Sequence, residues 1–239
     1  MKKTALVAAT TLVLSMSLAM PAHAGIYDDM LVAIKRASAP DVISILNRGL
    51  DPNLVDREGY TLLMLAVRDG DAEIVDILLA AKANPNARNA HGDTPLRLAA
   101  YRGSLPMVEK LVKARALINT PGWTPTIYAA FNGHDPVVSY LLDNGALIDA
   151  QADNGFTALI AAARGGHEAV VELLLKKGAN PNLKSDAGET AMDFALRSNN
   201  TMIYDRLLAA GARSGTAIDN QEATPPRKDG EATNAPAAK

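Results

Sequence analysis

The sequence contains no cysteine among its 239 residues. Disulfide bonds, thiolate nucleophiles and cysteine-ligated zinc sites are therefore excluded. The folded chain has to be stabilised by packing and hydrogen bonding, even in a compartment that permits disulfides.

Aromatic residues are also scarce. They make up 4% of the chain, with a single Trp, whereas hydrophobic residues together reach 48%. The hydrophobic content is sufficient for a sizeable core, so the chain is not intrinsically disordered. A composition rich in Ala and Leu but poor in rings favours thin, closely stacked helical layers.

Neither sign of charge dominates, since 24 Lys and Arg residues stand against 26 Asp and Glu residues. Nucleic acids and anionic membranes attract strongly basic surfaces, so the charge balance argues against both as the main partner. Acidic pairs such as Asp71/Glu73 and Glu168/Glu172 are expected on outward helix faces as solvated charges.

The first 24 residues have the order of a secretory signal peptide. A basic start at Lys2 and Lys3 is followed by an apolar segment from Ala5 to Met20 and then by Ala22-His23-Ala24. This order predicts cleavage after Ala24. A membrane anchor needs about 20 apolar residues, and this segment is shorter and interrupted by Thr and Ser. We therefore expect export to the periplasm, with no membrane insertion after cleavage.

Three markers recur in one register along the rest of the chain. The first is the glycine of a Gly-x-Thr turn, at intervals of 33, 30, 33 and 33 residues. The second is a glycine, or finally an asparagine, eleven residues later, and the third is an aliphatic pair nineteen residues after the first glycine. The first glycines are Gly59, Gly92, Gly122, Gly155 and Gly188; the second positions are Gly70, Gly103, Gly133, Gly166 and Asn199; the pairs begin at Leu78, Leu111, Leu141, Leu174 and Leu207. Three co-registered markers indicate an internal repeat.

The residue pattern of each unit predicts a turn followed by two short helices. The threonine of each Gly-x-Thr turn can cap the first helix with its hydroxyl, and Pro95 and Pro125 follow at the first helical position. The second glycine is expected to have a left-handed backbone, which Asn199 tolerates better than most residues. The capping threonines are Thr61, Thr94, Thr124, Thr157 and Thr190.

This pattern resembles the ankyrin repeat, a unit of about 33 residues made of a β-turn or hairpin finger and two antiparallel helices. The segments Gly-Asp-Thr-Pro-Leu-Arg-Leu-Ala-Ala at 92–100 and Gly-Ala-Asn-Pro-Asn at 178–182 carry the resemblance most clearly. It implies an all-α solenoid of about six helix-turn-helix units with β-turn or hairpin fingers.

The expected organisation is a signal peptide at 1–24, an ankyrin-repeat domain at 25–215 and a disordered tail at 216–239. The tail lacks periodicity and apolar anchors, and the two terminal units lack some of the markers, as capping repeats often do. The units are an N-terminal cap repeat at 26–56, repeats at 57–89, 90–119, 120–152 and 153–185, and a C-terminal cap repeat at 186–215.

The sequence departs from the family pattern in two ways. The histidine that usually follows Thr-Pro-Leu is replaced in every unit, so its hydrogen bonds near the turn must be replaced or absent. The 30-residue interval removes three residues from the finger around Pro121. Loop length often drifts without consequence; alternatively, the shortened finger makes a notch in the binding surface beside Trp123. The replacements of the histidine are Met64, Arg97, Ile127, Ile160 and Asp193.

No Gly-x-Ser-x-Gly, Walker or His-Glu-x-x-His motif occurs. We therefore predict no catalytic, cofactor-binding or metal-binding residues, and no cofactor. His134 and His167 each follow a second glycine, a position at which ankyrin-like repeats commonly carry a structural Gly-His pair. His91 falls in a finger and is expected to be solvated.

In ankyrin-like stacks, the inner helices and finger tips line a concave surface that commonly binds proteins. Two variable columns should face it: the residue after each first glycine, and the residue nine after that glycine. These columns are rich in Tyr, Trp and Arg, which are enriched at binding hot spots. The alternative is that some rings of these two columns pack against neighbouring units. Three aromatic residues outside the columns, Phe194, Tyr128 and Tyr140, are expected in the core. The predicted protein-binding residues are Tyr60, Arg68, Tyr101, Arg102, Trp123, Phe131, Phe156, Arg164 and Arg197.

The resemblance and the signal peptide together imply a monomeric, non-enzymatic protein–protein interaction module in the periplasm. An adaptor, an inhibitor and an immunity-type protein all fit this description. Two alternatives stay open: a metal-binding protein or enzyme that uses His134 and His167, and a secreted, host-directed ankyrin effector, against which the Sec-type signal argues.

Overall fold

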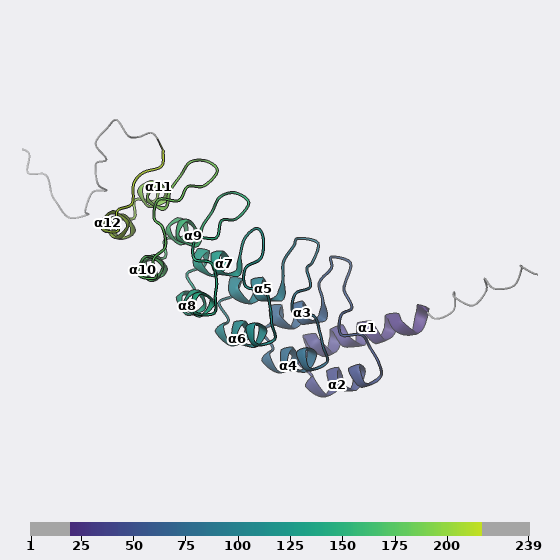
Figure 1. Ribbon diagram of the computed structural model, residues 1–239. Coiled ribbons are helices and arrows are strands. Elements are labelled where there is room, and N and C mark those ends of the chain that lie inside the picture. The colour runs from purple at the N-terminus through teal and green to yellow at the C-terminus, as the bar shows by residue number, and fades with distance from the viewer. Residues whose placement is uncertain (1–19, 217–239) are drawn as a thin grey trace, which may run out of the picture.

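The computed structural model describes residues 20–216, which form twelve helices in six consecutive pairs. Figure 1 shows the first helices of the pairs side by side in one row, the second helices in a parallel row, and the loops before the first helices projecting on one side. The first row contains α1 (Met20–Lys35), α3 (Leu62–Asp69), α5 (Pro95–Tyr101), α7 (Pro125–Phe131), α9 (Ala158–Gly165) and α11 (Ala191–Arg197). The second row contains α2 (Ala39–Asn47), α4 (Ala72–Ala80), α6 (Leu105–Lys113), α8 (Asp135–Asp143), α10 (Glu168–Lys176) and α12 (Thr201–Ala209). The predicted all-α solenoid of six units is confirmed.

The first helix of each of the last five repeats begins immediately after its predicted threonine. The Oγ1 of Thr61 accepts a hydrogen bond from the N–H of Met64 at 3.1 Å, and the next three threonines make the same contact. Thr190 forms a capping box, in which Asp193 accepts a hydrogen bond from the N–H of Thr190 at 2.7 Å. These side chains satisfy backbone groups that have no partner inside the helix. The Gly-x-Thr motif therefore fixes where each helix starts.

The link between the two helices of a pair passes through the left-handed backbone region, as predicted. Asn199 adopts it with φ 52°, which confirms that asparagine replaces glycine at this turn. The glycines at the equivalent positions are Gly70 (86°), Gly103 (71°), Gly133 (76°) and Gly166 (75°).

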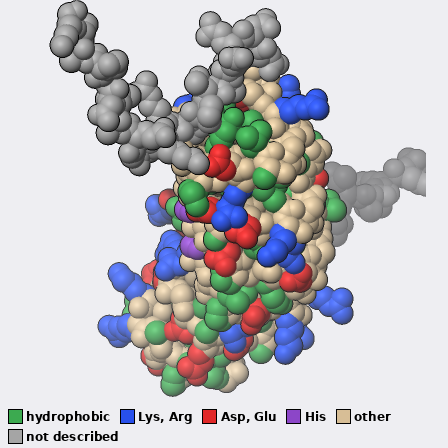
Figure 2. Space-filling model, turned by 90° about the vertical axis from the view of Figure 1, so that its left-hand side faces the viewer, with side chains coloured by type: hydrophobic (Ala, Val, Ile, Leu, Met, Phe, Trp, Pro, Cys, Tyr) green, Lys and Arg blue, Asp and Glu red, His purple; other side chains and the backbone are tan. Residues whose placement is uncertain are grey.

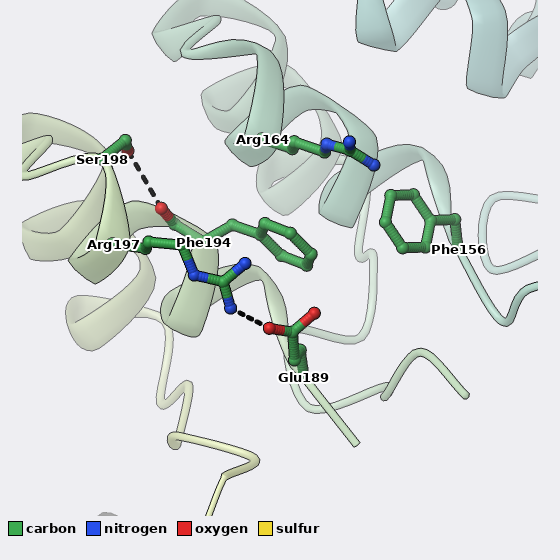
Figure 3. Close-up of a pocket in the computed structure, with 6 residues that line it drawn as sticks. All are labelled: Phe156, Arg164, Glu189, Phe194, Arg197 and Ser198. Carbon is green, nitrogen blue, oxygen red and sulfur yellow. Dashed lines mark hydrogen bonds and ion pairs between the residues drawn. The ribbon is translucent and has the colours of Figure 1, made fainter. Parts of the chain in front are cut away.

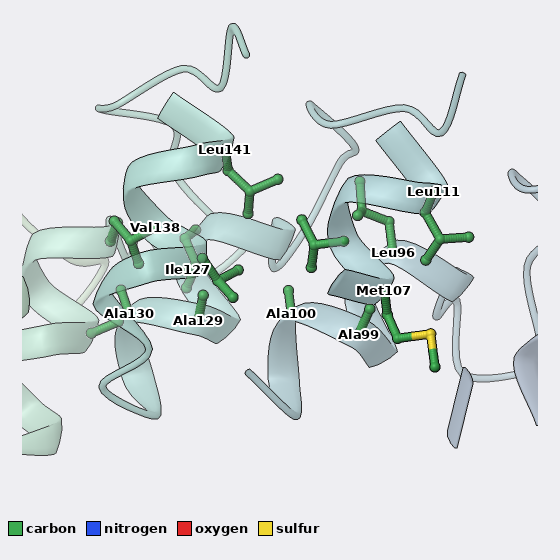
Figure 4. Packing of buried hydrophobic residues seen from close by; sticks show 14 of the residues in the cluster. Leu96, Ala99, Ala100, Met107, Leu111, Ile127, Ala129, Ala130, Val138 and Leu141 are labelled. Carbon is green, nitrogen blue, oxygen red and sulfur yellow. The ribbon is translucent and has the colours of Figure 1, made fainter. Parts of the chain in front are cut away.

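Alanine lines the contact between neighbouring first helices. Ala99 and Ala100 of α5, and Ala129 and Ala130 of α7, are fully buried. Small side chains allow helices to approach closely, while larger aliphatic side chains fill the space between the two rows. Figure 4 shows this division for the third and fourth repeats, where the larger side chains are Leu96, Met107, Leu111, Ile127, Val138 and Leu141. One core thus runs along the whole stack.

Four of the five fingers close as hairpin-like turns. In the finger before α5, the N–H of Asn89 donates to the carbonyl of Asp93 at 3.1 Å, and the N–H of Gly92 donates to the carbonyl of Asn89 at 3.0 Å. The fingers before α3, α9 and α11 repeat this pair of bonds. The shortened finger before α7, which lies within the described residues, lacks them. A guanidinium group of the preceding repeat, that of Arg97, donates instead to the carbonyl of Pro121.

The two predicted terminal segments fall largely outside the described residues. Positions 1–19 of the predicted signal peptide and 217–239 of the predicted tail are not described. Helix α1 begins at Met20 and runs across the predicted cleavage site after Ala24. Among residues 20–216, every helix is too short or too polar to cross a membrane.

Candidate binding surface

Aromatic side chains from four successive repeats form a continuous ladder along the row of first helices. Ring centroids of neighbouring members lie 5.2 to 6.0 Å apart, in edge-on or tilted arrangements. Such arrangements are favourable because the positive edge of one ring faces the negative face of the next. We call this set the aromatic ladder: Tyr101, Tyr128, Trp123, Phe131, Phe156 and Phe194.

Exposure differs along the aromatic ladder. Tyr101 is 54% exposed, Trp123 and Phe131 are half-buried, and Phe156 and Phe194 are only 6% and 7% exposed. Phe156, predicted to contact a partner directly, instead packs against Phe194 of the next repeat with 5.5 Å between centroids. The aromatic ladder is therefore an exposed surface at its Tyr101 end and part of the core at its Phe194 end.

Two predicted arginines lie over the buried end of the aromatic ladder. The guanidinium carbon of Arg164 is 5.4 Å from the centroid of Phe156 and 6.0 Å from that of Phe194. The guanidinium carbon of Arg197 is 5.1 Å from the centroid of Phe194, and its Nη2 pairs with Glu189. A guanidinium within about 6 Å of a ring face is attracted to the negative face of the ring. Both cations are therefore held above an apolar floor.

These groups surround a pocket of about 480 Å³ between the last two repeats. Figure 3 shows Arg164 reaching from α9 towards Phe156, and Arg197 reaching from α11 to Glu189. Among residues 20–216, the guanidinium of Arg197 has an acidic partner and that of Arg164 has none. The lining residues are Phe156, Arg164, Glu189, Phe194, Arg197 and Ser198.

A second hollow of about 670 Å³ lies near the N-terminal end of the stack, between side chains of α1, α3 and the first finger. Arg68, which lines it, is 5.8 Å from the ring centroid of Tyr60 and 3.4 Å from the carboxylate of Asp69. Of the predicted residues, Arg68 and Arg102 line this hollow and Tyr60 lies beside Arg68, away from the C-terminal pocket. Its charged lining residues are Lys35, Asp56, Arg68, Asp69 and Arg102.

Phe194 is buried, as predicted, but it also lines the C-terminal pocket, and Tyr128, predicted in the core, is half-buried within the aromatic ladder. Neither residue was predicted as part of this surface. Each lies three residues before a predicted binding residue, Phe131 or Arg197, on the same short helix. Residues three apart on a helix are neighbours on one face, so this spacing could have identified them. Tyr140, also predicted as core, is half-buried on α8 in the other row.

His134 and His167 contact backbone of the preceding repeat. The Nε2 of His134 is 3.0 Å from the carbonyl oxygen of Tyr101, and the Nε2 of His167 is 2.9 Å from that of Phe131. Both imidazoles are thereby committed to inter-repeat hydrogen bonds, which favours a structural role. His91 is exposed, as expected of a finger residue.

Arg97 occupies the position of the histidine that the repeat pattern usually carries. It is buried, and its Nη1 donates to the carbonyl of Gly92 at 2.7 Å in its own finger. Its Nη2 donates to the carbonyl of Pro121 in the next finger. The planar fork of one guanidinium therefore joins two adjacent fingers.

Three acidic residues expected as solvated charges have structural partners. Asp71 caps α4 by accepting hydrogen bonds from the N–H groups of Glu73 and Ile74, both at 3.0 Å. Arg206 of the last repeat pairs with Glu168 at 2.7 Å and with Glu172 at 3.0 Å. The expectation was incomplete because the cation that Glu168 and Glu172 share belongs to the next repeat. Figure 2, which faces the C-terminal end of the stack, shows acidic and basic side chains interspersed.

Comparison with known proteins agrees with this geometry. The family model described as ankyrin repeats (three copies) matches residues 30–121, 77–152, 114–185 and 148–221, and no curated protein matches the chain. The crystal structure of the human ASB11 ankyrin repeat domain is similar, with a TM-score of 0.72 and 25% identity over 77% of this chain and 84% of that chain. A chain from the solved complex of the Bdellovibrio bacteriovorus predatory endopeptidase Bd0816 with immunity protein Bd3460 has a TM-score of 0.69 and 30% identity, covering 76% of this chain and 97% of that chain. The chain therefore belongs to the ankyrin-repeat family, whose repeats are protein-interaction modules.

Proposed function

We propose that this protein is a non-enzymatic binding protein of the periplasm. It binds one folded protein through the face that carries the aromatic ladder. The observation that carries the proposal is the exposed end of the ladder, where Tyr101 is 54% exposed next to half-buried Trp123 and Phe131. Such rings lose little conformational entropy on binding, because their neighbours already hold them in place. Six stacked repeats are long enough for the roughly 800 Å² that each partner contributes to a standard interface.

Among binding roles, an inhibitor or immunity-type role is favoured over an adaptor role. The support is the 30% identity to a chain of a complex that joins an endopeptidase to an immunity protein, with nearly the full length of that chain covered. An inhibitor needs one large, preorganised surface for one partner. The aromatic ladder, which includes Tyr101 and Phe156 with Arg164 above it, can supply such a surface.

The periplasmic location rests on the signal-like order of the first 24 residues. Fractionation of the native host, with N-terminal sequencing of the protein, tests it. We expect a periplasmic protein that begins at Gly25. Cytosolic protein that retains Met1 would contradict the location, and accumulation in the culture medium would support a host-directed effector instead.

Crosslinking in intact cells, followed by mass spectrometry and calorimetry with the purified partner, tests the binding role. Tyr101→Ala and Arg68→Ala remove exposed side chains, so the helical circular dichroism should stay unchanged. Truncation of a binding hot spot costs about 2 kcal/mol or more, so we expect each variant to weaken binding by tenfold or more.

The matched control is Leu147→Ala, which shortens a 64% exposed apolar side chain outside the aromatic ladder. It should leave the affinity unchanged. Phe156→Ala is unsuitable as a binding test because loss of a buried ring costs about 3–5 kcal/mol of stability. Binding that tolerates both Tyr101→Ala and Arg68→Ala but not Leu147→Ala would place the interface elsewhere.

A further inference from the structure

We infer that the pocket between α9 and α11 receives an aspartate or glutamate side chain from an exposed loop of the partner protein. The inference rests on the proposed function and adds the chemistry that the partner must present. It concerns the rim formed by Arg164, Arg197 and Glu189 and the floor formed by Phe156 and Phe194.

The charge of the rim favours an anion. Two guanidinium groups face one carboxylate, and that carboxylate, Glu189, already pairs with Arg197. Arg164 has neither an ion pair nor a side-chain hydrogen bond to any of residues 20–216. A guanidinium presents five donors in a planar fork that matches a carboxylate. Among the described residues, one positive charge at the mouth of the pocket therefore remains unmatched.

The floor is compatible with such an anion. Phe156 and Phe194 are almost fully buried and present ring surface, rather than polar groups, to the pocket. Ring surface carries no donor or acceptor of its own, so the floor does not compete with Arg164 for an incoming carboxylate. The methylene groups of Asp or Glu would lie against the rings while the carboxylate reaches Arg164.

The position of Arg164 is also restricted before binding. Its guanidinium carbon lies within 6.0 Å of both ring centroids, so two cation–π contacts restrict the side chain. A neutral apolar side chain would cover the cation without pairing it, and a cationic side chain would be repelled. An acidic residue flanked by an apolar residue is the partner chemistry that satisfies both rim and floor.

Selection of random twelve-residue peptides displayed on phage, against the full chain, tests the inference. We expect the selected peptides to carry Asp or Glu beside an apolar residue. Their affinity should fall at least tenfold with Arg164→Gln and further with Arg164→Glu, and it should weaken as the salt concentration rises. Trp123, the only Trp, lies 5.9 Å from Phe156 and should report binding through its fluorescence.

Lys176→Gln is the matched control, because it removes an exposed cation of the same repeat from the other helix row. It should leave the affinity within twofold. Selected peptides without acidic residues, or a library that yields no binder sensitive to Arg164→Gln, would overturn the inference.

The partner captured by crosslinking separates this inference from the proposed function. If its affinity depends on Tyr101 and Arg68 but not on Arg164, the carboxylate site is wrong and the binding role stands. If none of the three positions matters, both proposals fail.

Discussion

The imidazole Nε2 of His134 lies 3.0 Å from the carbonyl oxygen of Tyr101, one repeat earlier in the stack. A carbonyl oxygen only accepts hydrogen bonds, so Nε2 carries the proton. His167 makes the same contact with the carbonyl of Phe131 at 2.9 Å. Each ring also fills the space beside the left-handed glycine of the preceding repeat, where a methyl group added at Gly103 would overlap the His134 ring. These histidines therefore hold the backbone of two members of the aromatic ladder.

His134→Ala should destabilise the protein by about 1 kcal/mol, the typical net contribution of one hydrogen bond, with an added cost from the lost packing. The urea midpoint of unfolding, followed by circular dichroism, measures the effect. His91→Ala is the matched control because His91 is an exposed finger residue, and it should leave the midpoint unchanged. Equal midpoints for the two variants would show that the contact to Tyr101 contributes nothing.

A second prediction concerns the amides that link the loops of successive repeats. Asn119 accepts a hydrogen bond from the N–H of Leu147 at 2.9 Å and donates to the carbonyl of Gly145 at 2.9 Å. Asp149, at the equivalent place one repeat later, accepts from the N–H of Asn180 at 3.0 Å. An ionised carboxylate has no proton to donate, so it cannot supply the second bond. Asp149→Asn should therefore raise the stability, by about 0.5–1 kcal/mol for an added hydrogen bond near the surface.

The reverse exchange is the control for this prediction. Asn119→Asp keeps the accepted bond but removes the donor to Gly145, so it should lower stability by a similar amount. Thermal unfolding of the two variants beside the parent protein measures both changes. A shift in the same direction for both would contradict the role assigned to the missing donor.

The third prediction is a loss of stability in acid, centred on Asp193. Burial of this carboxyl opposes its ionisation, but hydrogen bonds from Ser214, Thr190 and Gly215 outweigh that effect and lower its pKa. A lowered pKa in the folded state means that Asp193 adds stability above the pKa of about 3.9 of an unfolded aspartate. This contribution is lost as the pH falls from about 4 through the lowered value.

Asp193→Asn should therefore destabilise the protein at neutral pH and flatten the fall in thermal stability below pH 4. The exposed Asp205 on α12 supplies the comparison, because Asp205→Asn should leave the thermal stability at neutral pH unchanged. If Asp193→Asn and the parent protein lost the same stability between pH 5 and pH 3, the role assigned to this carboxyl would be wrong.

The sequence predicts the repeat fold well because the determinants of each helix pair are local. A threonine hydroxyl caps a helix three residues away, as Thr61 does for Met64, and a left-handed turn requires glycine or asparagine at one position, such as Asn199. These short-range requirements recur in register, so the helix starts and the turns between helices could be located without coordinates.

Contacts between repeats were harder to predict because they join residues that are distant in the sequence. Phe156 packs against Phe194, and Arg206 pairs with Glu168, each across 38 positions of the chain. The columns identified from the sequence contain most of the residues of the surface. Which rings are exposed and which form a pocket floor depends on side-chain rotamers and on the neighbouring repeat. Phe156, predicted to contact a partner directly, is therefore buried against Phe194.

The last prediction concerns Arg97, whose guanidinium joins the finger of its own repeat to the shortened finger of the next. The shortened finger lacks the pair of backbone bonds that closes the other four, so its carbonyl at Pro121 depends on this contact. Arg97→Met keeps an unbranched side chain of the type that Met64 places at the same repeat position, but it donates no hydrogen bond. Because each bond from a charged donor contributes about 1.5–3 kcal/mol, we expect the free energy of unfolding to fall by at least about 2 kcal/mol.

In the Arg97→Met variant, amide hydrogen exchange should accelerate in residues 118–123, with little change in the finger before α3, which closes through its own backbone bonds. Unchanged exchange in residues 118–123 would mean that the shortened finger holds its shape without Arg97.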